Sequence, residues 1–267
     1  MSNIDFIKIN NFSDLHNGKD IFFCKTDFLQ EDFNTISSLN NDVLLITGNA
    51  DYGITDDIVN QAPKNIKTWY AENALSNHHI LKPMPLGMEN KEYSERSGHG
   101  VGYQQRVQEK EDIINNLNNQ SPDRNLYANF NVGTNPEYRS VVKNVCLQSS
   151  DIDWQECDLS LKDFFETITL YKMVVCPIGN GVDTHRLWEV LYCNRVPVTV
   201  KVGNFKIYEL YEKLPIIILP SLDHLLDTKY VLQQYEEIKN KKYDMSILNS
   251  DFWRKSIIQD AKNINIR

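Results

Sequence analysis

The sequence CPIGNGVDTHRLWEVLYCNRVPVTVK, residues 176–201, joins two hydrophobic runs through a glycine-rich turn. The run MVVCPIG predicts a strand, THRLWEVLYC predicts a helix, and RVPVTVK predicts a second strand. The turn between the first strand and the helix contains Gly179 and Gly181. An anion is attracted to such a turn because the first helical residues have free backbone N–H groups and the peptide dipoles are aligned.

The side chains after this turn extend the same chemistry. His185 and Arg186 add donors beside the backbone amides, and an arginine can bind phosphate oxygens in bidentate fashion. Glu189 follows Arg186 at helical spacing, where a carboxylate suits ribose hydroxyls better than phosphate. From spacing alone, a surface ion pair between Arg186 and Glu189, with His185 as a capping residue, explains the pattern equally well.

Length and composition indicate an ordinary globular protein. The chain has 267 residues, enough for two domains that each bury a core, and 41% of them are hydrophobic. Its formal net charge of −8 disfavours binding to nucleic acid.

Targeting signals and cysteine usage point to the cytoplasm. The five cysteines show no framework spacing, which favours reduced thiols. The N-terminus lacks the basic and apolar regions of a signal peptide, and no apolar run is long enough to span a membrane. We therefore expect no transmembrane segment, so any contact with a membrane would be peripheral.

Strand-like and helix-like segments alternate along the chain, which predicts an α/β protein with parallel sheets. A polar, glycine-containing connector, 89–106, separates two such regions. Strands are expected in 20–25, 42–51, 65–73, 124–133, 173–179, 195–201 and 215–220. Helices are expected in 29–39, 105–117, 136–148, 159–172, 184–193, 204–214, 221–242 and 251–264.

The segment 176–201 resembles the donor-binding segment of exostosin-like glycosyltransferases, where a strand and loop precede an R-x-x-E helix and an I/V-P-V strand. Asn194-Arg195 replace the glycine that usually precedes that last strand. YANFNVGTNPEYR, 127–139, is similar to the first strand, loop and helix of that family's C-terminal domain. ITGNADYGI, WYAEN and PMPLGMEN resemble N-terminal segments of its small bacterial and viral members, so the resemblance extends from about residue 42 to 220.

The resemblance implies a GT-B fold, in which two Rossmann-like domains face each other across a cleft. Residues 1–100 would form the acceptor-side domain and 101–267 the nucleotide-sugar-binding domain, and the last helix could pack back on the first. It also implies an inverting glycosyltransferase that moves a sugar to a glycan or glycolipid acceptor. The co-substrate would be a UDP- or GDP-linked sugar, with no metal and no other cofactor.

Candidate site residues follow from the motifs and this resemblance. Asp51, just after a predicted strand, is the candidate general base, although an Asx-turn aspartate would look the same. Glu72 and His78 are the reserve candidates for this base, and Glu72, Asn73 and His78 are candidates for contacts with acceptor or sugar. The candidate donor-binding residues are Thr134, Arg139, Gly181, Asp183, Thr184, His185, Arg186 and Glu189.

Other patterns are weaker. Asp151-Ile152-Asp153 is formally a DxD motif, but we place it in a polar loop before Trp154 and expect no metal there. A different class of function also fits the sequence, namely a non-catalytic α/β protein that binds a sugar or phosphate. It would lack a carboxylate or histidine at the anomeric carbon of a bound donor.

Overall fold

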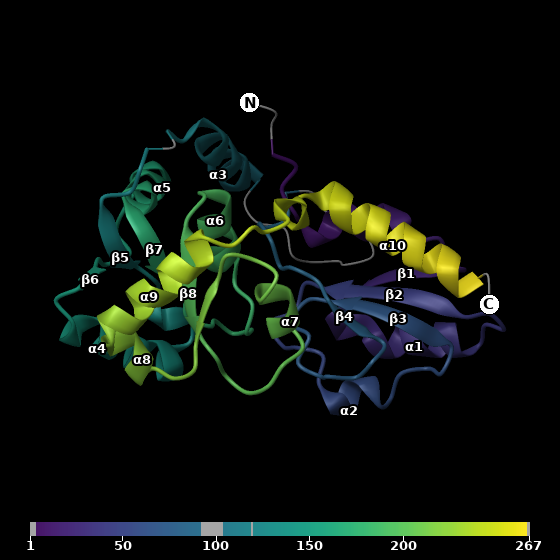
Figure 1. Ribbon diagram of the computed structural model, residues 1–267. Helices are drawn as coiled ribbons and strands as arrows, with labels where there is room; N and C mark the ends of the chain where they lie inside the picture. The colour runs from purple at the N-terminus through teal and green to yellow at the C-terminus, as the bar shows by residue number, and fades with distance from the viewer. Residues whose placement is uncertain (1–3, 92–103, 119, 266–267) are drawn as a thin grey trace. The chain divides into compact units, whose positions relative to one another are not determined.

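The structure, a computed structural model, describes residues 4–91, 104–118 and 120–265 (Figure 1). Most of the predicted connector, 92–103, lies outside the described residues. Contacts divide the chain into two compact units. Unit 1 comprises Met1–Val107, Asn204–Leu210 and Met245–Arg267, and unit 2 comprises Gln108–Gly203 and Tyr211–Asp244. Each unit contains a parallel sheet, which confirms the predicted α/β class.

The sheet of unit 1 winds in one direction. Its order is β1-β2-β3-β4, with bounds Ile21–Lys25, Val43–Gly48, Ile66–Ala71 and Leu81–Pro83. Each strand of this sheet is added beside the previous one, always on the same side. When every connection between such parallel strands is right-handed, all of the connections cross the same face of the sheet. Helix α1, Leu29–Ser37, packs on that face, where Phe33 contacts Trp69 edge to face at 5.7 Å between ring centroids. The short helix α2, Asp56–Val59, lies in the next connection.

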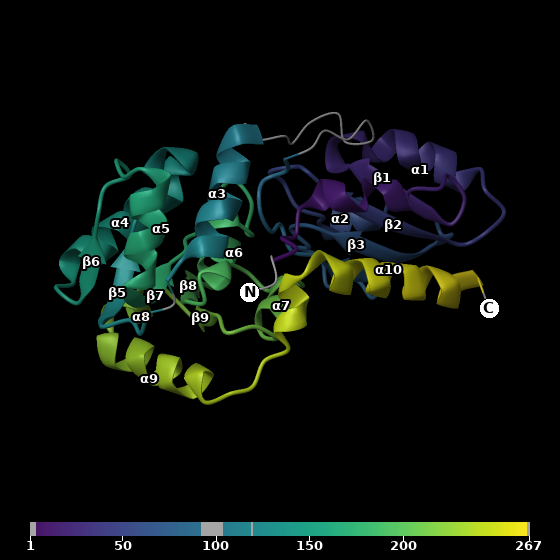
Figure 2. The ribbon, with the colours of Figure 1, turned by 90° about the horizontal axis from the view of Figure 1, so that it is seen from above.

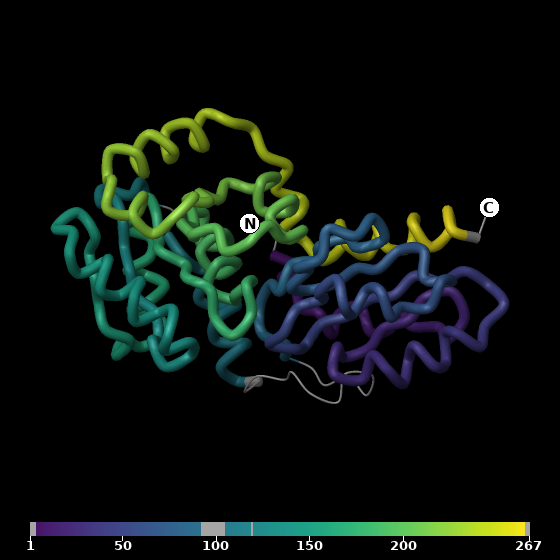
Figure 3. Tube along the Cα trace, turned by 90° about the horizontal axis from the view of Figure 1, so that it is seen from below, coloured from purple at the N-terminus to yellow at the C-terminus, as the bar shows by residue number. Residues whose placement is uncertain are grey.

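The opposite face of this sheet is covered by the last helix, α10, Ser250–Asn265. Figures 2 and 3 show α10 running along the strands on the side away from α1. Trp253 packs edge to face on Tyr70 at 6.4 Å between ring centroids. The Asp260 carboxylate accepts hydrogen bonds from Tyr70 Oη and Lys82 Nζ, both at 2.6 Å. The C-terminal helix therefore covers the face of the sheet that the connections between the strands leave uncovered.

In the sheet of unit 2, the direction in which successive strands are added reverses after β6. Its order is β6-β5-β7-β8-β9, where the strands are β5 (Arg124–Ala128), β6 (Ile152–Trp154), β7 (Tyr171–Val175), β8 (Val196–Val200) and β9 (Ile217–Leu219). Three helices share a hydrophobic core with one face: α4 (Pro136–Gln148), α8 (Asp223–Leu226) and α9 (Thr228–Lys239). The other face carries α3 (Gln104–Asn116), α5 (Leu161–Thr169) and α6 (His185–Tyr192) (Figure 1).

Local sequence explains several element boundaries. Pro136 begins α4 and Asn135 caps it, because the Asn135 side chain accepts from the backbone N–H of Tyr138. Asn194 follows α6 with φ of 56°, a left-handed conformation that glycine usually adopts after a helix. Asparagine tolerates this conformation better than most residues, so Asn194 can end α6 in place of a glycine.

Three predicted elements were wrong. The expected helix 221–242 is two helices, because Asp227 interrupts it and caps α9 by accepting from Tyr230 N. The expected helix 204–214 is reduced to α7, Tyr208–Tyr211, because the N–H of Ile207 donates to the carbonyl of Ala74. The expected loop at the DxD motif is edge strand β6, of which Ile152 is the buried residue.

None of the helices in the described part of the chain has the length and apolar character needed to cross a bilayer. All five cysteines are free thiols, and Cys157 alone among them is exposed. The free cysteines agree with the reduced thiols expected from their spacing.

The packing of α10 predicts the effect of truncating Trp253. This side chain is 6% exposed and donates through Nε1 to the carbonyl of Ile247. Replacing it with alanine should cost about 3–5 kcal/mol in the free energy of unfolding, measured with urea. Lys255→Ala, on the exposed side of α10, should stay within about 0.5 kcal/mol of the parent. Equal costs for the two variants would contradict the assignment of α10 as a core layer.

Candidate functional site

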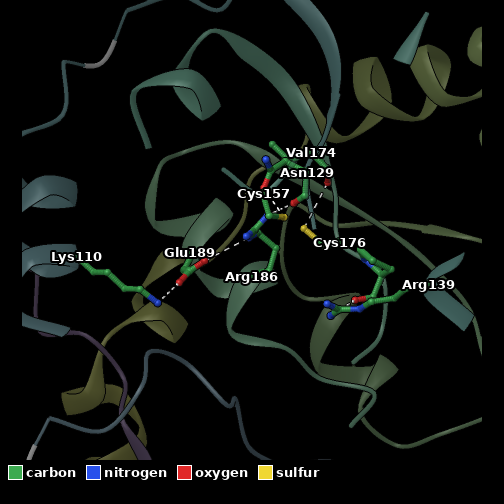
Figure 4. A network of polar contacts seen from close by, with 9 residues as sticks. Lys110, Asn129, Arg139, Cys157, Val174, Cys176, Arg186 and Glu189 are labelled. Atoms are coloured by element: carbon green, nitrogen blue, oxygen red, sulfur yellow. Dashed lines mark hydrogen bonds and ion pairs between the residues drawn. The ribbon is translucent and has the colours of Figure 1, made fainter. Parts of the chain in front are cut away.

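The candidate site lies where the strand order of unit 2 reverses. The chain passes from β5 to β6 on one side and later from β7 to β8 on the other. The loop after β5, 129–135, and the loop after β7, 176–184, therefore diverge from two adjacent strands. In open parallel sheets, ligands bind outside the carboxyl ends of the strands at such a switch point. Figure 4 shows a network of polar contacts near these loops, in which Asn129 and Cys176 are labelled.

Arg139, on α4, joins these two loops. Its guanidinium donates from Nη1 to the carbonyl of Asn131, and from Nε to the carbonyl of Ile178, both at 2.8 Å. Nη2 lies 3.4 Å from the carbonyl of Pro177. Burial lowers the pKa of Arg139, and the positive charge of Arg186 lowers it further. No carboxylate pairs with Arg139 among the described residues, so a buried cation is held here by backbone carbonyls.

The glycine turn after β7 is fitted closely around these contacts. Asn135 Nδ2 donates to the carbonyl of Gly179 at 2.7 Å. A Cβ at Gly179 would lie 3.3 Å from Arg139 Nη2 and 3.5 Å from the methyl groups of Thr134 and Thr184. A side chain at this position would thus be tight against Arg139, whereas glycine fits without displacing it. Gly181 accepts at its carbonyl from the N–H of Gly179, which closes the turn.

Arg186, in the first turn of α6, points toward the end of β5 (Figure 4). Its Nη1 donates to the carbonyl of Asn129, and its guanidinium lies over the Phe164 ring at 4.2 Å from the centroid. Its Nε is 3.4 Å from Oε2 of Glu189. The Arg186 side chain is 23% exposed, so it is oriented by the protein and still accessible to a ligand.

Glu189 is buried between two cations. Lys110 Nζ, on α3, donates to Glu189 Oε1 at 2.8 Å, and Arg186 lies at the other oxygen. Burial by itself would raise the pKa of Glu189, but the charges of Lys110 and Arg186 and the hydrogen bond from Lys110 outweigh it and lower the pKa to about 2. The sequence predicted Glu189 as a ribose ligand and did not identify Lys110. Lys110 lies in a charged helical stretch, QEKED, that gives no signal of burial.

Asp183 holds the start of α6 in place. It is 2% exposed and accepts hydrogen bonds from Trp188 Nε1 at 2.9 Å, from Tyr211 Oη at 2.7 Å and from the backbone N–H of Thr184 at 3.0 Å. Thr184 is the N-cap residue and makes no side-chain capping bond. His185 follows it and is half-buried. The structure thus brings together the donor-site candidates of unit 2 around one turn.

The candidates of unit 1 lie in two places. Asp51 is exposed in a bend that follows β2, and Glu72 is buried directly after β3. Glu72 Oε2 accepts from the backbone N–H of Asn49 at 2.8 Å, and Asn49 has φ of 60°. Asn73 is also buried. His78 lies in the connection to β4, where Nδ1 accepts from Ile80 N at 3.4 Å.

Three asparagines connect this edge of the unit 1 sheet. Asn10 donates its backbone N–H to Asn90 Oδ1 at 2.9 Å, Asn90 Nδ2 donates to Asn49 Oδ1 at 2.6 Å, and Asn49 Nδ2 donates to Asn10 Oδ1 at 2.8 Å. The sequence carries no signal of this amide ring, because its members are far apart in the chain. It fixes the turn that leads to Asp51.

The DxD motif makes contacts of a structural kind. Asp151 Oδ2 accepts from Thr228 Oγ1 at 2.9 Å, and Asp153 Oδ2 accepts from Tyr171 Oη at 2.8 Å. Within the described ranges, no three side chains of His, Cys, Asp and Glu gather as a metal ion would require.

No protein-family model matches the sequence, and neither does any curated protein. Among solved structures, the chain is similar to apo OtsA, with 10% identity and a TM-score of 0.48 over 95% of this chain and 75% of that one. It is also similar to a trehalose-6-phosphate protein from E. coli bound with UDP-2-fluoro glucose, with 11% identity and a TM-score of 0.44 over 96% and 76% of the two chains. A structure of the wall teichoic acid polymerase TagF with CDPG gives 12% identity and a TM-score of 0.28 over 96% and 93%. Similarity of this degree identifies no function.

The lowered pKa of Glu189 predicts how stability depends on pH. Its stabilising effect is fully present above the pKa of an unfolded glutamate, about 4.3, and is lost as the pH falls towards 2. The difference in unfolding free energy between the parent and Glu189→Gln should therefore shrink by about 1–2 kcal/mol between pH 5 and pH 3 in urea titrations. Glu166→Gln, at an exposed ion pair with Lys162, is the control and should show no such change. A constant difference for Glu189→Gln would refute the pairing.

Proposed function

We propose that this protein is a glycosyltransferase that moves a sugar from a UDP- or GDP-linked donor to a glycan acceptor, with inversion and without a metal. The observation that carries the proposal is the switch point of unit 2, where Arg186 reaches the end of β5 beside a glycine turn held by Arg139. The GT-B arrangement and the exostosin-like relationship are part of this proposal.

A diphosphate suits this site for electrostatic reasons. The Gly179 turn allows close backbone approach, and Thr184 leaves the first N–H groups of α6 uncapped by its side chain. Arg186 offers a partly exposed guanidinium next to them. Groups that are already oriented toward a developing negative charge stabilise a transition state without reorganising. His185 and Thr134, at the rim of the same turn, are proposed as further donor contacts.

Arg139, Asp183 and Glu189 are proposed to act indirectly. Arg139 donates to backbone carbonyls, and Asp183 accepts from the backbone at the start of α6. Glu189 pairs with Lys110 and Arg186. We therefore assign them to shaping and orienting the donor site, in place of the direct contacts with donor expected for them.

The proposed reaction is a single displacement. A hydroxyl oxygen of the acceptor forms a bond to the anomeric carbon, while the bond from that carbon to the diphosphate oxygen breaks. The electron pair leaves with the diphosphate, and the hydroxyl proton passes to a general base. Attack opposite the leaving group inverts the anomeric centre.

Asp51 is proposed as that base. It is an exposed carboxylate at the carboxyl edge of the unit 1 sheet, on a turn fixed by Glu72 and the asparagine ring. Glu72 and Asn73 are buried, so we propose that they support this edge, while His78 remains a candidate for acceptor contact.

The donor site is tested by titrating UDP and GDP calorimetrically, with and without EDTA. Arg186→Gln should weaken binding of the preferred nucleotide by about 10- to 100-fold, because a charge-assisted contact is lost. Arg186→Lys should recover only part of the affinity, since lysine lacks the planar fork. Lys162→Gln, an exposed cation on α5, is the control and should bind as the parent does. Failure of the parent to bind either nucleotide would overturn the proposal.

The base is tested by Asp51→Asn. Transfer from the bound donor to methyl pyranosides, followed by release of nucleoside diphosphate, should slow by about 100- to 10,000-fold. Nucleotide affinity should be unchanged, because Asp51 is not assigned to the donor site. Asp57→Asn, an exposed aspartate on α2, should retain full activity. Full activity in Asp51→Asn would exclude it as the base.

A further inference from the structure

Lys110 is a buried cation that the proposed mechanism does not use. Its side chain is 7% exposed, and Nζ lies 2.8 Å from Glu189 Oε1 (Figure 4). The other oxygen of Glu189 faces Arg186 Nε at 3.4 Å. Lys110, Glu189 and Arg186 therefore form a continuous chain of charges from α3, through α6, to the end of β5.

The positive and negative charges around Arg186 do not cancel. Arg139 and Arg186 lie close enough that the charge of Arg186 lowers the pKa of Arg139. Together with Lys110 they are three cations, and Glu189 and Asp183 are the two carboxylates at the same turn, which gives a net charge of 3 − 2 = +1. If Lys110 were absent, Glu189 would neutralise one of the two arginines. Lys110 thus determines how much positive charge remains for a ligand.

Lys110 also affects how Arg186 is oriented. Glu189 can hold Arg186 Nε only while its carboxylate stays ionised in a buried place, and a buried carboxylate needs a close cation to remain ionised. Arg186 is oriented from three sides, by Glu189, by Asn129 and by the Phe164 ring. Of these contacts, the one from Glu189 depends on Lys110 of α3, which pairs with the same carboxylate.

We propose that Lys110 is a positioning residue of the donor site: through Glu189 it orients Arg186, and its charge leaves the switch point with a net positive charge, which favours a nucleoside diphosphate because it carries more negative charge than the monophosphate. This inference rests on the proposed function and deepens it. It predicts a preference for a nucleoside diphosphate over the corresponding monophosphate. A purely structural ion pair would affect folding stability and leave that preference unchanged.

The test uses calorimetric titration of UDP, GDP and their monophosphates against the full chain. In Lys110→Met, affinity for the diphosphate should fall by about tenfold or more, the equivalent of one charge-assisted contact, and affinity for the monophosphate should fall less. Lys110→Arg should stay close to the parent. Lys162→Met, at an exposed pair, is the matched control.

A double variant separates charge from geometry and covers the case in which Lys110→Met fails to fold. Lys110→Met/Glu189→Met removes the whole buried pair, and such a replacement is often neutral or stabilising. Its net charge is 2 − 1 = +1, from Arg139, Arg186 and Asp183, and is equal to that of the parent. We expect it to fold and still to bind the diphosphate several-fold more weakly, because Arg186 has lost its carboxylate partner.

The outcomes are distinct. If the parent binds neither UDP nor GDP, the proposed function fails. If the parent binds, and Lys110→Met or the double variant folds and keeps the parental affinity and diphosphate preference, the role of Lys110 is refuted while the donor site stands.

Discussion

The buried guanidinium of Arg139 is the contact on which the candidate site depends. The reversal of strand order sends the loops after β5 and β7 in different directions, so no backbone pairing holds them together. Arg139 bonds to carbonyls of both loops, and its fixed fork of donors can reach them simultaneously. A lysine could not do the same, since its donors radiate from a single nitrogen. The carbonyl bonds also supply partners for a cation that burial disfavours, which is the condition under which a buried charge is tolerated.

Electrostatic balance follows from that arrangement. Two arginines close together in a partly buried region repel each other, and the carboxylate of Glu189 offsets the repulsion on one side only. Lys110 restores the positive excess by pairing with the same carboxylate. Under the proposed function, the cations are already in place before a diphosphate binds, so binding relieves repulsion and requires little rearrangement. Residues that make no direct contact with the diphosphate would then still affect its affinity.

The parts of the fold that the sequence predicted are those with local signals. Pro136 after Asn135 marked the start of α4 correctly, and the strand, glycine turn and helix around Arg186 were found where expected. Non-local features were missed. Lys110 and Glu189 are 79 residues apart, and the pairing depends on how α3 packs, which helix periodicity does not reveal. The break at Asp227 is a local cap that was missed because helix-forming sequence lies on both sides of it. The short edge strand β6 was missed because one buried residue is too weak a pattern. The sequence predicted that Arg139 would place a cation at the switch point. It did not predict that the guanidinium would donate its hydrogen bonds to backbone carbonyls.

The two sheet edges differ in chemistry, and the difference bears on which ligand each can hold. At the carboxyl edge of unit 1, Asn10, Asn49 and Asn90 bond to one another through neutral amides, with the Glu72 carboxyl group bonded to the backbone beside them. Neutral amides exchange hydrogen bonds with hydroxyl groups at little cost in desolvation, whereas they cannot compensate the desolvation of a diphosphate. At the edge of unit 2, Arg139 and Arg186 supply cations, which the desolvation of a diphosphate requires. The proposed function accordingly assigns the diphosphate of the donor to unit 2. To unit 1 it assigns Asp51, an exposed carboxylate at an edge of neutral amides, as the group that accepts a proton.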